Sequence, residues 1–165
     1  MEIVSFARNK YNDQAAELFL QENKKLKERL EHADIHHVGS SAIPGTLTKG
    51  DVDIQVRVKQ EEFDEAVRVL ESLYPVDEKG EQTASFRSFY TKETVLPLGV
   101  QLTVCHSKHD VFHKFRDVLL INEGYRDQYD ELKASYEGKD LESYREAQRH
   151  FFDQLKKTPE YRSMK

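Results

Sequence analysis

Residues 36–58 of the sequence read HHVGSSAIPGTLTKGDVDIQVRV, and this stretch decides the fold. Small and turn-forming residues fill its middle, whereas its last seven residues alternate four apolar side chains with Asp53, Gln55 and Arg57. A period of two is typical of a β-strand with one buried face and one polar face. The stretch therefore predicts a strand over residues 52–58, with Asp53 pointing away from the apolar face.

Helical and extended patterns alternate on both sides of this strand. Apolar residues recur at three- and four-residue steps in several segments, and short β-rich segments lie between them. The expected helices cover residues 12–30, 61–73 and 108–165, the last with breaks at 122–124 and 137–139. The expected strands cover residues 35–38, 52–58, 83–90 and 100–104, the last two as a hairpin with Pro97 and Gly99 outside its ladder. This order predicts an α+β fold in which helices pack on a mixed β-sheet and the C-terminal half is helical.

Length and composition narrow the class of protein. The chain has 165 residues, near the usual size of one domain, so we expect residues 1–165 to form a single domain. Asp and Glu number 30 against 25 Lys and Arg, and this net charge of -5 does not favour a general nucleic-acid binder. The single cysteine excludes an internal disulfide and a Cys-rich zinc site. Without an apolar signal segment or membrane span, the sequence predicts a cytoplasmic protein with no membrane partner.

Two carboxylates and a glycine-serine turn form the candidate site. Asp51 and Asp53 stand two residues apart, so on a strand they point to the same side and could hold Mg²⁺, which prefers carboxylate and phosphate oxygens. Gly39, Ser40 and Ser41 follow a β segment, where a glycine lets backbone N–H groups and hydroxyls approach a phosphate. The serines could equally cap a short helix or turn, and the aspartates could simply begin a solvated strand. Together they predict a site for Mg²⁺ and a phosphorylated ligand.

A Gly-Ser turn followed by Asp-x-Asp on a strand resembles the signature of the DNA polymerase beta-like nucleotidyltransferase superfamily. The resemblance implies that Gly39 and Ser40 hold a nucleoside triphosphate. It also implies that Asp51 and Asp53 are catalytic ligands of metal ions that clamp the attacking and leaving oxygens. The expected partner is thus a nucleoside triphosphate or another phosphorylated small molecule.

Three segments give a closer resemblance to the GrpB family, a branch of that superfamily. Residues 37–45 read HVGSSAIPG, like the family's His-Val-Gly-Ser-Thr-Ser-Val-Pro-Gly, and residues 115–119 and 129–133 read FRDVL and YDELK, like its Phe-Arg-Asp-Tyr-Leu and Tyr-x-x-Leu-Lys segments. The resemblance covers most of the chain. Because Arg116 lies in one of these segments, we expect it to assist nucleotide binding through its charge.

The strand at residues 100–104 departs from the pattern of active nucleotidyltransferases. These enzymes place a third carboxylate there, and GrpB-like chains typically show His-x-His, whereas this chain has Gln101 and Thr103. Neither side chain can accept a proton from an attacking hydroxyl. Two main hypotheses therefore stay open: a protein that binds a nucleoside triphosphate with Mg²⁺ and transfers a nucleotidyl group to an acceptor, or a catalytically degenerate member that binds a small molecule or a protein. A third, supported only by the amphipathic C-terminal helices, is a structural partner that acts through those helices.

The histidines carry weaker signals. His36 and His37 are neighbours on a predicted strand, so one should face the core and the other the site. His109 and His113 have the spacing of a helical zinc pair. Since the sequence offers no third ligand for them, we expect these two side chains to lie on a solvated helix surface.

Overall fold

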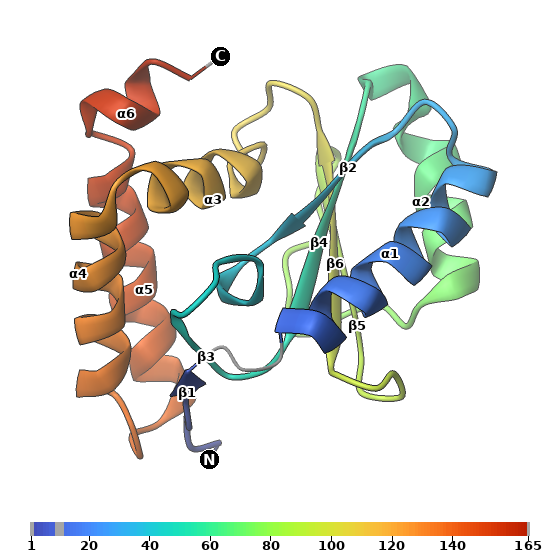
Figure 1. Cartoon of the computed structure of the whole chain (residues 1–165). Coiled ribbons are helices and arrows are strands. Elements are labelled where there is room, and N and C mark those ends of the chain that lie inside the picture. The colour runs from blue at the N-terminus through green and yellow to red at the C-terminus, as the bar shows by residue number, and fades with distance from the viewer. Residues whose placement is uncertain (1, 9–11, 165) are drawn as a thin grey trace.

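The structure, a computed structural model, describes residues 2–8 and 12–164 (Figure 1). The helices are α1 (Asn12–Arg29), α2 (Phe63–Leu73), α3 (Phe112–Ile121), α4 (Glu123–Ser135), α5 (Leu141–Leu155) and α6 (Pro159–Arg162), with 3-10 turns η1 (Ser40–Ala42) and η2 (Gln60–Glu62). The strands are β1 (Ala7–Arg8), β2 (Asp34–Val38), β3 (Leu47–Thr48), β4 (Val52–Val58), β5 (Phe86–Thr91) and β6 (Leu98–Val104). The predicted α+β fold with a helical C-terminal half is confirmed.

A four-stranded mixed sheet forms the centre of the fold, with the strand order β2-β4-β6-β5. β4 and β6 are parallel, whereas β2 and β5 pair antiparallel with β4 and β6, respectively. The predicted hairpin is present, but the prediction that Gly99 lies outside its ladder was wrong, because Gly99 pairs with both Tyr90 and Asp53. A glycine fits this ladder position because the carboxylate of Asp53 occupies the space that a Cβ atom would need.

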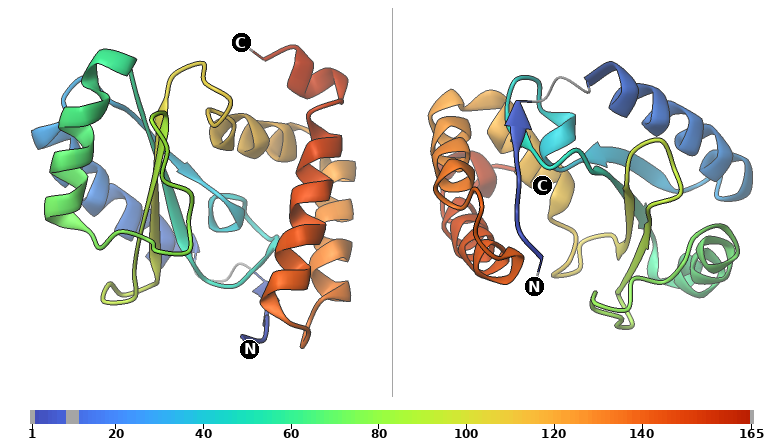
Figure 2. Two further views of the ribbon diagram at one scale, coloured as in Figure 1. Left: turned by 180° about the vertical axis from the view of Figure 1, so that it is seen from behind. Right: turned by 90° about the horizontal axis from the view of Figure 1, so that it is seen from below.

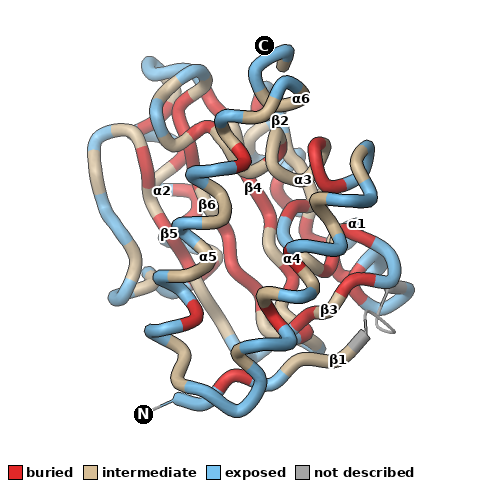
Figure 3. The backbone as a smooth tube through the Cα atoms, turned by 90° about the vertical axis from the view of Figure 1, so that its left-hand side faces the viewer, coloured by how far each residue is buried: buried red, intermediate tan, exposed pale blue. Residues whose placement is uncertain are grey.

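The apolar face of the sheet is covered by α1 and α2, which lie side by side in both Figures 1 and 2. Val52, Ile54, Val56 and Val58 of β4 face this layer, as their alternation predicted, and all are buried. Ala15, Leu18 and Leu26 of α1 and Phe63, Ala66 and Leu70 of α2 complete the core. Figure 3 shows that the buried positions are concentrated along β4 and β6. Because the apolar side chains of β4 are buried against α1 and α2, the side chain of Asp53 must lie on the opposite face of the sheet.

The opposite face of the sheet carries a buried hydrogen-bond network that holds α3. Arg57 of β4 donates two hydrogen bonds of 2.7 Å to the carboxylate of Asp110, from Nε to Oδ1 and from Nη2 to Oδ2. The side-chain amide of Gln55 donates a hydrogen bond of 3.0 Å from Nε2 to Asp110, and its Oε1 accepts one of 2.9 Å from the backbone N–H of His113. Because these groups are paired in a poorly solvated place, they fix how the helical half sits on the sheet.

The prediction that His109 and His113 form a solvated pair was wrong. His113 is buried beneath β4, and burial lowers its pKa to about 4. His109 comes just before α3 and stacks on Phe86, with ring centroids 4.8 Å apart. Helical spacing does not reveal which face of a helix meets a sheet, and here the polar residues of the sheet supply partners for histidine.

The helices α3 to α6 form a second layer, whose small core contains Val118, Leu119, Tyr129 and Leu155. In Figure 2, α4 and α5 run side by side at a distance from the sheet, and α3 bridges towards β2. Among the described residues, no helix is both long enough and apolar enough to cross a membrane.

Candidate active site

Asp53 lies between two glycines from the neighbouring strands. An ideal Cβ atom built on Gly39, after β2, would lie 2.6 Å from Oδ2 of Asp53, and one built on Gly99 of β6 would lie 2.8 Å from Oδ1. Both distances are shorter than real Cβ contacts allow, so only glycine leaves the carboxylate in this place. Gly39 also has a φ of 77°, a conformation that other residues adopt only with strain. The expected approach of Asp53 to the glycine-serine turn is thus present.

The protonation of Asp53 reflects its enclosed position. Burial raises the pKa of this carboxyl to about 7, and the charge of Asp51 adds to the rise, whereas Lys49 and a hydrogen bond from Gln101 lower it. Burial is thus the larger cause of the raised pKa, and repulsion from Asp51 is the smaller one. A cation placed beside such a carboxylate stabilises its charged form.

Asp51 directly precedes β4 and shares the cavity with Asp53. Its side chain is 25% exposed, and its Oδ2 lies 3.7 Å from Nζ of Lys49. Burial together with the charges of Asp51 and Asp53 raises the pKa of Tyr90 to about 12. The two aspartates therefore act on the same region of the sheet face, as their spacing predicted.

The two serines of the turn point in different directions. Ser40 lines the cavity and hydrogen-bonds the hydroxyl of Tyr129. Ser41 is buried outside the cavity lining, where its hydroxyl lies 3.0 Å from Nε2 of His37. His37 in turn stacks on Phe19 of α1. Both serines lie inside η1, whose N-cap residue is Gly39 and has no side-chain capping hydrogen bond, so neither serine caps the turn. Ser40 is the serine that faces the cavity.

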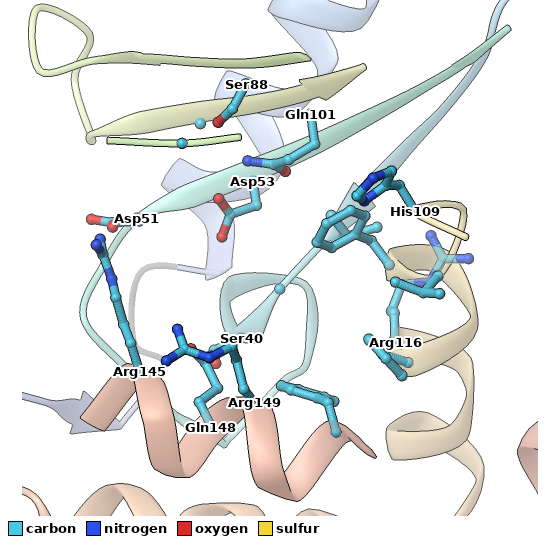
Figure 4. A pocket seen from close by; sticks show the side chains of 18 of the residues that line it. Ser40, Asp51, Asp53, Ser88, Gln101, His109, Arg116, Arg145, Gln148 and Arg149 are labelled. Carbon is cyan, nitrogen blue, oxygen red and sulfur yellow. The ribbon is translucent and has the colours of Figure 1, made fainter. Parts of the chain in front are cut away.

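Arg116 reaches the edge of the cavity from α3. Its guanidinium donates to the carbonyl oxygen of His37 over 3.1 Å and to Nδ1 of His36 over 3.2 Å, and it pairs with Asp117 at 2.9 Å. Figure 4 shows Arg116 on α3, on the other side of the cavity from Asp51. Its contacts attach α3 to β2.

Gln101 of β6 is one of the two residues at which the resemblance leads one to expect a third carboxylate. Its side chain hydrogen-bonds Asp53, and its Oε1 atom is buried with no hydrogen-bond partner among the described residues. Thr103, the other candidate position, is fully buried and accepts a hydrogen bond of 3.0 Å from Gln55. Of the two, only Gln101 faces the carboxylates.

A cavity of about 780 Å³ separates this part of the sheet from α5 (Figure 4). This volume lies within the range of about 300–1,000 Å³ that is usual for small-molecule sites. Asp51 and Asp53 line one wall, and Arg145, Gln148 and Arg149 line the opposite wall. Sequence reasoning missed these three residues of α5. Their spacing of three and four residues places them on one helix face, and this was the signal that could have found them.

The donor set suits a hard divalent cation. Two carboxylates face one cavity, and the glycines on either side of Asp53 leave room for both of its oxygens. Among the described residues, no group of three or more His, Cys, Asp or Glu side chains could hold a metal ion. The protein therefore offers two carboxylates, and a phosphorylated ligand would supply further oxygens, which is the way Mg²⁺ is usually bound.

Comparison with known structures shows which proteins have a similar fold. GLD-2 in its complex with RNP-8 matches with a TM-score of 0.50 and 12% identity, over 78% of this chain and 47% of that chain. The crystal structure of the conserved protein GrpB from Enterococcus faecalis matches with a TM-score of 0.62 and 21% identity, over 79% of this chain and 81% of that one. The mixed sheet and its helices thus form a nucleotidyltransferase-like α+β fold.

Sequence comparison gives the family. A model described as GrpB protein matches residues 8–158, so the chain belongs to the GrpB family. A UPF0157 protein of Vibrio cholerae is 27% identical over 150 residues, which cover 91% of this chain and 80% of the relative. The resemblance found in three sequence segments is confirmed.

Proposed function

We propose that the chain binds a nucleoside triphosphate together with Mg²⁺ in the cavity between the sheet and α5. Asp51 and Asp53 would hold the metal, and Gly39 and Ser40 would contact the phosphates. The observation that carries the proposal is the position of Asp53, enclosed by two glycines and carrying a pKa of about 7. Folding places a carboxylate in an environment that disfavours its charge, which is characteristic of functional sites.

The fold supports the same chemistry. GLD-2, which shares this fold, is named as part of a non-canonical poly(A) polymerase complex. Bound Mg²⁺ would neutralise charge on the phosphates and orient them. The chain would supply the two carboxylates, the turn at Ser40 and the cavity that holds the ligand.

Transfer of a nucleotidyl group from this ligand would be weak. An attacking hydroxyl must lose its proton, and the side chain nearest Asp53 on β6 is the amide of Gln101, which cannot take one. This observation favours a second function, in which the chain is a binding module that retains the pocket and has lost catalysis. Both functions require binding of the nucleoside triphosphate, and only the first includes transfer of a nucleotidyl group.

Thermal unfolding with each nucleoside triphosphate, with and without MgCl₂, tests the binding step, because a ligand of the native state raises the unfolding temperature by mass action. We expect a shift that requires both triphosphate and Mg²⁺ and disappears in Asp53→Asn. Asp127→Asn is the matched control, because Asp127 is exposed on α4 and does not line the cavity. An equal shift in folded Asp53→Asn and wild type would contradict the assignment.

A further inference from the structure

Two arginines of α5 face the cavity from the side opposite the aspartates. Arg145 and Arg149 are four residues apart, so they lie on the same face of the helix. Both line the cavity. In Figure 4, Arg145 extends from α5 towards Asp51, and Arg149 lies near Ser40. The helical wall of the cavity is therefore basic where the sheet wall is acidic.

Neither arginine has a partner within the described part of the chain. No hydrogen bond or ion pair joins either guanidinium to residues 2–8 or 12–164, and both arginines are exposed. Glu142 and Glu146 stand three residues before Arg145 and Arg149, a spacing that allows ion pairs on a helix, yet neither pair forms.

Two like charges at a spacing of four residues also destabilise a helix. The helix therefore carries an electrostatic cost on its cavity face. A bound anion would remove this cost.

Three other cations around the cavity are already engaged. Lys49 lies 3.7 Å from Asp51, Lys156 lies 3.9 Å from Asp153, and Arg116 pairs with Asp117. Lys108, which precedes α3, also lines the cavity, but only α5 presents two arginines on one helix face.

The two walls require a ligand with two kinds of group. A cation must lie beside the carboxylates, and negative charge must remain for the arginines. A monophosphate carries about two negative charges, which one divalent cation neutralises. A triphosphate keeps negative charge after the metal is bound, and arginine binds phosphate oxygens in pairs.

We propose that Arg145 and Arg149 bind the phosphate chain on the side away from Asp51 and Asp53, and that they select triphosphates over monophosphates. The inference rests on the proposed function for the metal-bound end of the ligand. The order across the cavity is carboxylates, Mg²⁺, phosphates and guanidiniums.

Isothermal titration calorimetry with ATP, AMP and inorganic tripolyphosphate, each with MgCl₂, tests this inference. The variants are the double substitution Arg145→Ala with Arg149→Ala, and the corresponding double substitution to lysine. Arg162→Ala is the control, because Arg162 is exposed on α6 and does not line the cavity. Alanine has the highest helix propensity, so the helix should stay folded, and thermal unfolding checks this.

We expect the double alanine variant to bind ATP and tripolyphosphate about tenfold or more weakly, and AMP as wild type does. The lysine variant should recover part of the affinity, because it retains the charge but not the paired hydrogen bonds. Wild-type affinity should also fall as the salt concentration rises, since these charges are exposed.

The outcomes separate this inference from the proposed function. ATP binding that is lost in Asp53→Asn but unchanged in the double alanine variant overturns the role of the arginines and leaves the proposed function standing. Tripolyphosphate binding that requires the arginines, without any metal-dependent binding of ATP, supports the role of the arginines and overturns the proposed function. Binding of neither ligand by wild type overturns both.

Discussion

Gly99→Ala is expected to disable the site without unfolding the chain. The new Cβ atom would lie 2.8 Å from Oδ1 of Asp53, and ordinary contact begins at 3.4 Å, so the carboxylate must move by about 0.6 Å (3.4 minus 2.8). Metal-ligand distances in proteins stay within about 0.2 Å of their preferred values. The displaced carboxylate would therefore lie outside the range in which it can bind Mg²⁺ together with Asp51.

The stability of this variant should be close to that of wild type. Gly99 lies in β6 without a positive φ, and glycine in a strand interior is about 0.5–1 kcal/mol less favourable than alanine. The atoms that must move belong to the end of a side chain, which can rotate at small cost. We expect the gain and the cost to offset each other within about 1 kcal/mol.

Two measurements on the same preparation decide the matter. Urea denaturation gives the free energy of unfolding, and calorimetry gives the affinity for ATP with MgCl₂. We expect an unchanged free energy of unfolding and an affinity at least about tenfold lower, because a ligand of the metal is lost. A folded Gly99→Ala variant that binds ATP with wild-type affinity would refute the idea that the position of Asp53 determines binding.

Three further predictions concern the same carboxylate. Gly39→Ala should lose metal-dependent binding and about 1–3 kcal/mol of stability. The control Gly138→Ala should lose stability alone, because Gly138 has a φ of 78°, close to the 77° of Gly39, but has open space at its Cβ. Equal binding by both variants would contradict this. Because the pKa of Asp53 is about 7 in the folded chain against 3.8 ordinarily, the folded state holds a proton that the unfolded chain has released, and the metal-free protein loses stability as the pH rises from about 4 to about 7. In urea denaturation, Asp53→Asn should be more stable than wild type at pH 8, with a smaller difference at pH 4; equal stability at pH 8 would count against the raised pKa. Gln101→Glu should increase the transfer of label from an α-labelled triphosphate, whereas Thr103→Asp should only destabilise the buried network; no increase in Gln101→Glu that still binds ATP would show that a carboxylate at this position is not sufficient.

Local sequence patterns predicted the parts of the fold that depend on local physics. The strand at residues 52–58 was found because its alternation separates a face buried under α1 and α2 from a face that carries Asp53. The pattern could not place Gly99 in the ladder, since that depends on the register of β6 against β4, a strand about forty residues earlier in the chain. The burial of His113 likewise depends on Gln55, which is 58 residues away in the sequence.

The candidate site also contains residues that the sequence predicted and residues that only the structure reveals. The approach of Asp53 to Gly39 followed from the short connection between two adjacent strands. Arg145 and Arg149 lie about ninety residues further along the chain, and only the packing of α5 brings them to the same cavity. The sequence thus predicted the acidic wall, whereas the basic wall required the structure.

A crystal structure of the chain with Mn²⁺ and a non-hydrolysable nucleoside triphosphate tests the central claim most directly, because anomalous scattering locates the metal. We expect a peak bonded to carboxylate oxygens of Asp51 and Asp53, at roughly the 2.0–2.2 Å typical of such ligands, with the phosphates between the metal and α5. A triphosphate bound elsewhere, or a metal peak away from both aspartates, would contradict the account.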